Sequence, residues 1–280
     1  MPRALIAGCG YVGRATARLL QEAGWEVTGV THSEESAAQL SAGTFRAVAC
    51  DISDSGMVRA RLGEFEPFEA VVDCVSSGGG GVAEYRKCYF DGAQNLLEFT
   101  RPGKFLFTSS TSVYAQNDGS LITEESPAEP LLETGRVLLE TEEFVLAAGG
   151  IVARLAGIYG PGRWVYLKKI LDGSAVIEGE GSRWINQIHR DDAAGAICHL
   201  LQLAAPSGIY NVADNTPLTL IECYRILSGH FHKPLPPGGP VEEQRKRGIA
   251  SKRVSNTKLR ETGWKPQFPS IREALNAFGG

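Results

Sequence analysis

Long apolar runs are missing from the 280-residue sequence. No segment approaches the run of about 18 apolar residues that a membrane-spanning helix requires. Met1-Pro2-Arg3 leads directly into a short apolar strand, without the apolar region and small-residue cleavage site of a secretion signal. We therefore expect a cytoplasmic protein with no membrane partner.

An excess of one charge is also missing, because 28 Lys and Arg residues stand against 32 Asp and Glu residues, a net charge of -4. The basic residues form no stripe that would follow a phosphate backbone, so we expect no nucleic-acid partner. Neither a C-x-x-C motif nor a zinc-type Cys/His spacing occurs, and His230 and His232 lack a third ligand. We expect no metal site and reduced thiols at all six cysteines. These are Cys9, Cys50, Cys74, Cys88, Cys198 and Cys223.

Strand and helix patterns alternate through the first 155 residues. Apolar residues at helical spacing predict helices at 11–24, 85–100 and 134–148. Strands alternating with helices imply a parallel sheet covered on both faces, so we predict an α/β, Rossmann-type doubly wound fold. Short apolar runs mark the predicted strands, at 4–7, 27–31, 45–50, 70–75, 104–108 and 150–155.

This alternation stops after Tyr159, where Gly160-Pro161-Gly162 breaks the chain. We predict a dinucleotide-binding domain at 1–159, to which 188–213 returns. A smaller C-terminal substrate lobe is expected to comprise 160–187 and 214–280. The predicted elements of this half are helices at 164–171, 188–204 and 218–228 and a strand at 208–212. The sequence does not decide between a monomer and a homodimer.

The most informative motif is G-x-G-x-x-G directly after the first predicted strand. Its residues are Gly8, Cys9, Gly10, Tyr11, Val12 and Gly13. The first glycine permits a tight turn, the second lets the backbone approach a pyrophosphate, and the third lets helix and strand pack closely. The helix that follows offers unpaired N–H groups to a phosphate. We therefore expect a bound dinucleotide.

The end of the second strand carries Thr31-His32-Ser33, where an NAD-binding unit usually has an acidic residue for the ribose 2′-OH. Two hydroxyls and an imidazole can donate to a 2′-phosphate, and Arg14 lies nearby. NADP is therefore favoured over NAD, although Glu34 and Glu35 leave NAD open. Asp51, after the third strand, either contacts the adenine or caps the next helix.

Five further segments resemble one protein family. They are Thr108-Ser109-Ser110-Thr111-Ser112-Val113-Tyr114, the stretch 154–162 (R-L-A-G-I-Y-G-P-G), Ile188-His189-Arg190-Asp191-Asp192-Ala193, and the tail segments 252–259 and 263–266. With the glycine motif, they resemble the NAD(P)-dependent epimerase/dehydratase group of the short-chain dehydrogenase/reductase superfamily, over nearly the whole chain. Ala115 stands where that group usually has glycine.

The resemblance implies hydride transfer assisted by a Ser or Thr and by a Tyr-x-x-x-Lys pair. Ser110, four residues before Tyr114, occupies the Ser/Thr place. The lysine lies four residues before a glutamate in a Y-G-x-S-K-x-x-x-E helix, and counting back from Glu140 gives Arg136, with Leu132 in the tyrosine place. The proton-passing phenol is then missing, and the permanently charged Arg136 can still hold the cofactor ribose.

A replacement proton donor is therefore needed if the protein is an enzyme, because a positioned donor contributes about 10²–10⁴-fold to the rate. Tyr114 and Tyr159 both follow strand ends and are candidates, with simple packing as the alternative. The resemblance places the backbone of Ala156-Gly157-Ile158 against the nicotinamide. Two hypotheses stay open: an oxidoreductase or epimerase/dehydratase-like enzyme, and an NADP-binding regulator or sensor without turnover.

Several polar residues of the predicted second lobe can bind an anionic small-molecule substrate, such as a sugar nucleotide, because guanidinium groups match phosphates and carboxylates. These are Arg163, Arg183, Asn186, His189 and Arg253. The alternative is a solvated rim with salt bridges to Asp191, Asp192 and Glu180. His189, before two aspartates, either acts in catalysis or orients a loop.

Overall fold

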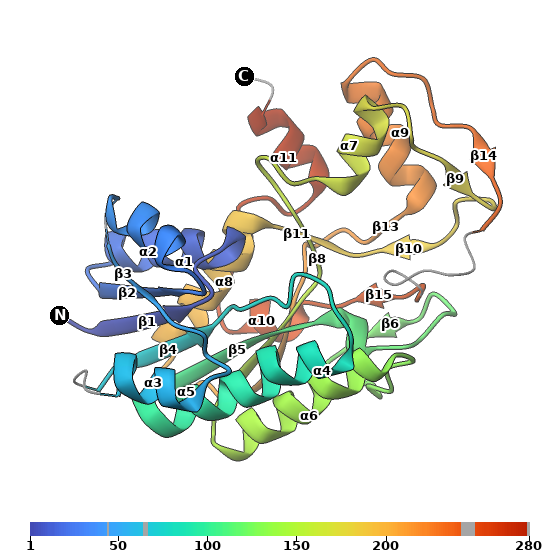
Figure 1. The fold of residues 1–280 in the computed structure, drawn as a ribbon. Coiled ribbons are helices and arrows are strands. Elements are labelled where there is room, and N and C mark those ends of the chain that lie inside the picture. Colours follow the sequence, from blue (N-terminus) through green and yellow to red (C-terminus); the bar gives the residue numbers. More distant parts are fainter. Residues whose placement is uncertain (44, 64–66, 242–249, 279–280) are drawn as a thin grey trace.

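The computed structural model describes residues 1–43, 45–63, 67–241 and 250–278. Its centre is a parallel sheet of seven strands (Figure 1). The strands are β1 (Arg3–Ala7), β2 (Glu26–Thr31), β3 (Arg46–Ala49), β4 (Ala70–Asp73), β5 (Lys104–Ser110), β7 (Ile151–Leu155) and β12 (Gly208–Val212). Their order is β12-β7-β5-β4-β1-β2-β3, so the chain reverses direction across the sheet between β1 and β4. This arrangement confirms the predicted Rossmann-type fold class.

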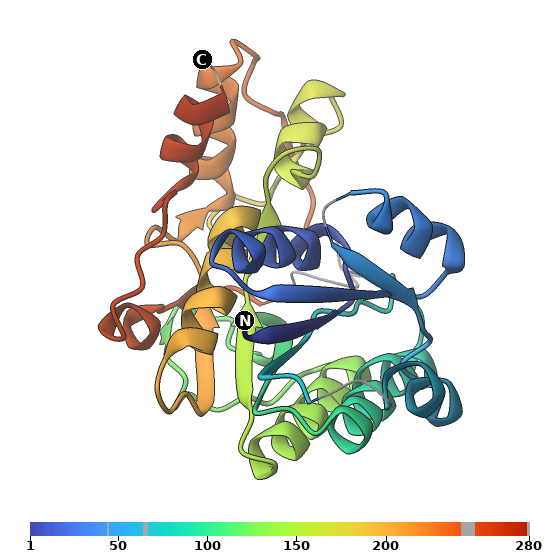
Figure 2. The same cartoon turned by 90° about the vertical axis from the view of Figure 1, so that its left-hand side faces the viewer.

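Helices cover both faces of this sheet. Side chains alternate between two apolar cores, so that Ile6 and Val72 lie in one and Leu5 and Val71 in the other. The helices α1 (Tyr11–Glu22) and α8 (Arg190–Gln202) pack side by side on the first face (Figure 2). The α2 helix (Glu34–Ser41) lies against β2 and β3. The second face carries α3 (Ser55–Leu62), α4 (Val82–Tyr85), the π-helical turn η1 (Arg86–Asp91), α5 (Gly92–Thr100) and α6 (Glu133–Ala147).

A third apolar core lies beyond the sheet, among α7 (Val165–Leu171), α9 (Leu220–His230) and α11 (Ile271–Phe278) (Figure 1). Short strands surround it, namely β9 (Ile177–Glu178), β10 (Trp184–Ile185), β13 (Leu218–Thr219) and β14 (Gly238–Gly239). Two strand pairs lie where this part meets the main sheet, β8 (Gly157–Tyr159) with β11 (Gln187–His189), and β6 (Leu121–Ile122) with β15 (Arg253–Val254). The predicted domain boundaries stay a prediction, and 242–249 and 279–280 of the substrate lobe lie outside the described residues.

Several elements differ from the predicted ones. The predicted helix 85–100 is α4, η1 and α5 in succession, and the helix expected within 188–204 starts at Arg190 because 187–189 form β11. The sequence did not predict α2, α3, α11 or α10 (Thr257–Glu261), whose apolar stripes are short. All six cysteines are free thiols. Within the described residues, no helix combines the length and apolar character needed to cross a bilayer.

A buried ion pair joins α6 to the sheet. The Arg154 guanidinium lies 2.5 Å from a Glu142 carboxylate oxygen, and the two side chains are 4% and 2% exposed. Ser109 on β5 donates to the same carboxylate at 2.5 Å, and Arg154 lies 4.7 Å from the ring centre of Tyr114. One pair of charges thus holds α6, β5 and β7 together.

We expect Glu142→Ala to lower the free energy of unfolding by about 3–5 kcal/mol, because it leaves the Arg154 charge buried without its carboxylate. Chemical denaturation measures this. Glu140→Ala is the matched control, since Glu140 pairs with Arg86 while about 43% exposed, and its loss should cost no more than about 1 kcal/mol. Equal losses in both variants would contradict the assignment of Glu142 as the stabilising carboxylate.

Candidate functional site

The glycine turn lies at the end of β1, beside β4. Gly8 has φ +81°, and a Cβ atom there would lie 2.6 Å from the backbone of Cys74 and Val75. A Cβ atom on Gly13 would lie 2.3 Å from the Gly8 carbonyl oxygen. The nearest atom to a Cβ on Gly10 is 4.0 Å away, so Gly10 faces open space. Gly8 and Gly13 are required for packing, whereas only Gly10 leaves room that a ligand can use.

The N-terminus of α1 is open at this turn. Gly10 caps the helix without a side-chain hydrogen bond, and the first turn of α1 contains no acidic residue. The first N–H groups of the helix, which have no acceptor within it, and the positive end of the helix dipole therefore lie beside the space at Gly10. Tyr11 and Val12, both expected to bind the cofactor, form this first turn, with Val12 packed into the core. The arrangement suits a phosphate group.

The residues expected near the adenosine ribose follow β2. Thr31 donates through Oγ1 to the Ser33 carbonyl at 3.2 Å, and Ser33 caps α2 by accepting from the Ser36 N–H. His32 is exposed. Both hydroxyls are thus engaged locally, and the imidazole of His32 faces solvent.

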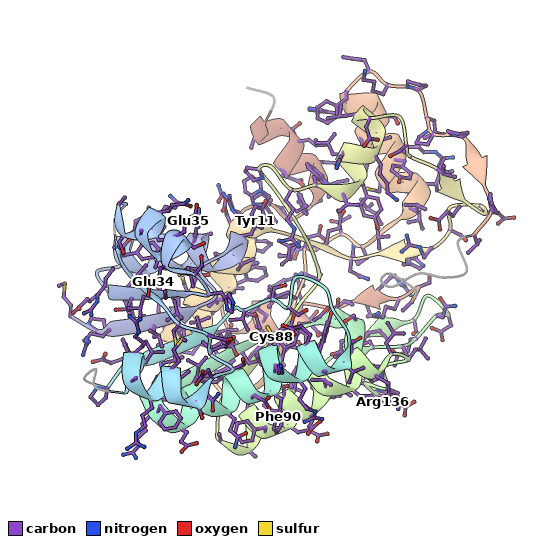
Figure 3. All side chains as sticks on the ribbon, viewed as in Figure 1. Tyr11, Glu34, Glu35, Cys88, Phe90 and Arg136 are labelled. Atoms are coloured by element: carbon purple, nitrogen blue, oxygen red, sulfur yellow. The ribbon has the colours of Figure 1, made fainter. Side chains whose placement is uncertain are left out.

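Two carboxylates near the end of β2, whose roles the sequence did not determine, have partners close by. Glu34 on α2 forms an ion pair with Arg61 on α3 at 3.1 Å, and Figure 3 shows Glu34 apart from Tyr11. Asp51 accepts from the N–H and the hydroxyl of Ser53 through Oδ1, at 2.9 and 2.8 Å. Asp51 therefore closes a turn before α3 and does not cap that helix as the second alternative expected, because the N-cap is Asp54, and Arg61 neutralises Glu34.

Asp73, at the end of β4, is a titratable group that the sequence analysis missed. It is fully buried, its Oδ1 accepts from the Val75 N–H at 3.2 Å, and among the described residues its Oδ2 has no hydrogen-bond partner. Burial raises the pKa of Asp73 to about 7. Val75 is also the residue that Gly8 approaches, so this carboxyl group lies directly behind the glycine turn.

The β5 end carries the predicted Ser110, which is half-buried. Its Oγ accepts from the Ser112 N–H at 3.1 Å, and Ser110 lies in register with Leu155 on β7. The segment Ala156-Gly157-Ile158 follows Leu155, and Gly157 is exposed while its N–H donates to the Asn186 carbonyl. The structure thus brings Ser110 close to the segment expected beside the nicotinamide.

The two candidate tyrosines point into the protein. Tyr114 is 1% exposed, and its hydroxyl donates to Asn211 Oδ1 at 3.0 Å. Tyr159 is 2% exposed and stacks on Trp164 with ring centres 4.5 Å apart. Burial raises the pKa of both phenols. Their positions at strand ends are as expected, but the packing alternative describes both side chains.

The α6 positions derived from Glu140 do not face the crevice. Leu132 caps the helix and is 42% exposed. Arg136 forms an ion pair with Glu133, with 63% of its side chain exposed. Figure 3 shows Arg136 far from Tyr11, on the outer side of the protein. The structure therefore does not place Arg136 where it could hold the cofactor ribose.

The buried glutamate of α6 suggests a different alignment with the family motif. Glu142, not Glu140, packs against the sheet. Counting back from Glu142 puts Leu138 in the lysine place and Thr134 in the tyrosine place, and Gly135 then matches the glycine after the tyrosine. Neither alignment supplies a phenol or an amine. Sequence counting missed this register because it cannot tell which glutamate is buried.

The residues expected to bind an anion are divided among several roles. The Asn186 side chain donates to the Lys252 carbonyl and accepts from the Val254 N–H, so it fastens the tail. His189 is 1% exposed and caps α8 through Nδ1, and burial lowers its pKa. Arg253 donates to the Gly119 carbonyl at 2.9 Å and lies 5.3 Å from the Trp184 ring centre.

The alternative of a rim of salt bridges is not what the described residues show. Asp192 is buried and accepts from the backbone N–H groups of Gln267 and Phe268, and Asp191 pairs with Arg190. In the described ranges, no ion pair connects the three arginines singled out from the sequence to these aspartates or to Glu180. Those arginines are Arg163, Arg183 and Arg253.

A buried lysine was also missed. Lys252 is 6% exposed, and its amine donates to the Tyr114 carbonyl at 2.8 Å. Burial lowers the pKa of Lys252 to about 8. Lys252 lies in the tail segment 252–259, which resembles the family. The sequence does not show whether a single lysine in such a segment is buried or exposed.

A family model and a protein of Escherichia coli each match most of the chain. The family model for the NAD dependent epimerase/dehydratase family matches residues 4–213. Protein YeeZ of Escherichia coli (strain K12) is 30% identical over 226 residues, which cover 76% of this chain and 77% of YeeZ.

Solved structures show the same fold. A protein from Methylobacillus flagellatus, provisionally named an NAD-dependent epimerase/dehydratase, is 28% identical with a TM-score of 0.80, covering 99% of this chain and 97% of that one. The UDP-glucuronic acid 4-epimerase from Bacillus cereus, in complex with UDP-glucuronic acid and NAD, is 18% identical with a TM-score of 0.79, covering 98% and 97%. At that identity the second likeness concerns the fold alone.

We expect Gly10→Val to abolish dinucleotide binding with little loss of stability, because the side chain enters open space beside the α1 N-terminus. Calorimetric titration with NADPH and NADH, together with thermal unfolding, measures both effects. Gly13→Val is the matched control and should unfold the protein, since its Cβ would overlap the Gly8 carbonyl. Unchanged nucleotide affinity in folded Gly10→Val would remove the site from this turn.

A second prediction concerns Asp73. Because its pKa is raised by burial to about 7, the folded protein keeps a proton that the unfolded chain has lost, and stability should fall as the pH rises from about 4 to about 7. Asp73→Asn should therefore be more stable than the wild type at pH 8, by a few kcal/mol at about 1.4 kcal/mol per pKa unit, and similar at pH 4. Denaturation across this pH range measures the difference.

The control is Asp54→Asn at the α3 N-cap, where asparagine caps as well as aspartate and little change is expected. A stability difference between Asp73→Asn and the wild type that does not vary with pH would contradict the assignment of Asp73 as a buried carboxyl group with a raised pKa.

Proposed function

The chain belongs to the NAD dependent epimerase/dehydratase family, and we propose that it binds a nicotinamide dinucleotide across the carboxyl edge of its sheet and uses it on a small-molecule substrate. The observation that carries this proposal is the open α1 N-terminus at Gly10, at the point where the strand order reverses between β1 and β4. Ligands of open α/β sheets bind at such reversal points.

NADP is the proposed cofactor. No carboxylate ends β2, and the nearest acidic residue of α2, Glu34, is paired with Arg61. A 2′-phosphate at this place would meet the exposed His32 and the N-terminus of α2, while the exposed Glu35 in the first turn of α2 is the carboxylate that opposes it. NAD, with only a ribose hydroxyl here, gains less from these groups.

The proposed reaction takes place at a carbinol or carbonyl carbon of a small, anionic, sugar-derived substrate. The nicotinamide, when bound, supplies or accepts the hydride. Ser110 is the proposed catalytic hydroxyl, because it is half-buried at the β5 end beside Ala156-Gly157-Ile158. Its role is to orient the reacting oxygen by a hydrogen bond. Tyr114 is left out of this role, since its hydroxyl is bound to Asn211 inside the protein.

The substrate is proposed to bind between the sheet edge and the predicted second lobe, 160–187 with 214–280. Arg253, held over Trp184, is the cation that we propose for binding it. Asn186 and His189 act indirectly in this scheme, because their polar atoms hold the tail and the start of α8. The epimerase from Bacillus cereus, which binds a UDP-sugar, supports the substrate class by analogy of fold.

A second candidate is an NADP-binding regulator without turnover. It is favoured by α6, which offers Leu132 and Arg136 in one register and Thr134 and Leu138 in the other. Neither pair replaces the tyrosine and lysine of the family motif, and a missing donor costs about 10²–10⁴-fold.

The deciding experiment combines binding with turnover. We expect NADPH to bind more tightly than NADH in calorimetric titrations, and NADP reduction or NADPH oxidation to appear in a screen of sugar nucleotides. Binding without turnover on any of them would favour the regulator. Equal or weaker binding of NADPH relative to NADH would refute the cofactor preference.

Two variants test the assignment of the catalytic hydroxyl in the turnover assay, with Tyr114→Phe as the matched control for Ser110→Ala. Ser110→Ala should lower kcat at unchanged NADPH affinity, because it removes the only proposed catalytic hydroxyl. Tyr114→Phe should retain the wild-type kcat, since its phenol is directed at Asn211. A lowered kcat in Tyr114→Phe with a wild-type kcat in Ser110→Ala would instead identify Tyr114 as the source of the catalytic hydroxyl.

A further inference from the structure

Two arginines stack against Tyr11, which directly follows the second glycine of the turn. The Arg163 guanidinium lies 5.4 Å from the ring centre of Tyr11, and that of Arg190 lies 5.2 Å from it. Arg163 comes from the loop after β8, and Arg190 is the first residue of α8. Neither contact follows from the glycine motif, because both arginines reach the turn from parts of the chain about 150 residues or more away in sequence.

The starts of two helices meet at the same place. α1 begins at Tyr11 and α8 at Arg190, and the two helices pack side by side (Figure 2). Each helix N-terminus carries a partial positive charge, and an arginine at the first position of a helix adds to that charge rather than offsetting it. The α8 N-terminus is offset by its His189 cap and by Asp191 and Asp192 in its first turn, so the positive potential of the site comes from the α1 N-terminus and the two guanidinium groups.

The two arginines differ in their carboxylate partners. Asp191 pairs with Arg190 at 2.8 Å, while Asp192 is buried and turned toward the backbone of Gln267 and Phe268. Arg163 is exposed, and within the described ranges no carboxylate lies in ion-pair distance of it. A guanidinium held against an aromatic ring without a carboxylate partner is available to bind an anion.

The loop that carries Arg163 is fixed to the turn. The Tyr11 hydroxyl donates to the Pro161 carbonyl at 3.0 Å. A Cβ atom on Gly160 would lie 2.9 Å from the Tyr11 hydroxyl and 3.0 Å from His189 Nε2, so a larger residue would push the loop away. The loop after β8 therefore reaches the glycine turn only because residue 160 is glycine.

We propose that Arg163 and Arg190, held on Tyr11, complete the phosphate site at the glycine turn and bind the pyrophosphate of the dinucleotide. This inference rests on the proposed cofactor binding and goes beyond it, because it takes Arg163 out of the expected substrate site. It also makes cofactor binding depend on the loop of the second lobe. Occupation of the turn by a pyrophosphate would stabilise the contact between that loop and α1.

The test measures the affinity of the full chain for NADPH and for ADP-ribose, which has the pyrophosphate but no nicotinamide. Arg163→Gln and Arg190→Gln should each weaken binding of both ligands about tenfold, the loss of one charge-assisted hydrogen bond. Their affinities should also depend less on salt than that of the wild type, because fewer screened charges contribute. Arg163→Lys keeps the charge and should restore most of the affinity.

Arg18→Gln is the control. Arg18 is an exposed residue of α1 that pairs with Glu22, so this variant should bind both ligands as tightly as the wild type. Unchanged nucleotide affinity in both Gln variants, with only the substrate KM raised, would overturn the proposal in favour of a substrate site. An equal loss of nucleotide affinity in Arg163→Gln and Arg163→Lys would also overturn the proposal, because the packing of the side chain and not its charge would then determine the affinity. If the wild type binds neither ligand, the proposed function itself fails.

Discussion

The close crossing of two backbones behind the glycine turn is the constraint on which the candidate site depends. Gly8 approaches Cys74 and Val75 so nearly that a Cβ atom would lie 2.6 Å from them, and Gly13 lies against the Gly8 carbonyl in the same way. This contact sets where α1 begins relative to β4, and so leaves the helix N-terminus facing the crevice. It also encloses Asp73, whose carboxyl group is fully buried one layer behind the turn. Packing and ligand binding thus make different demands on the three glycines of one motif.

The sequence predicted what depends on local spacing. The glycine turn, the parallel strands and the Rossmann-type class follow from apolar periodicity and from the position of the motif after a strand, and the structure confirms the fold class. The π-helical turn η1 was not predicted, because one extra residue in a helical turn leaves no clear periodic signal. The α6 register failed for a tertiary reason. Glu140 and Glu142 are equivalent in sequence, and only Arg154, on a strand that follows α6, determines which of them is buried.

Side-chain direction was the second limit of the sequence. Tyr114 and Tyr159 follow strand ends, as expected, but their hydroxyls are not at the surface of the crevice. Tyr114 lies between the Arg154 guanidinium and Asn211, and Tyr159 lies in the third core against Trp164. A buried phenol with a raised pKa is a poor proton donor to an oxygen outside, because reaching it would mean breaking the contacts that bury it. Position at a strand end is therefore necessary for a catalytic role but does not establish one.

The start and the middle of α6 differ in how strongly the stability of the fold constrains their residues. Replacing Glu142 leaves a buried guanidinium without its carboxylate, so the middle of the helix is fixed by stability. Leu132 and Arg136, at the start of α6, are exposed, and in the register counted from Glu142 the lysine place holds the apolar Leu138, so neither register leaves a buried charge unpaired. The helix can therefore lose the phenol and the amine of the family motif while keeping the fold and the cofactor turn. Any turnover must then use a proton from elsewhere, for example from the half-buried hydroxyl of Ser110 or Thr134, from a water molecule or from the substrate itself.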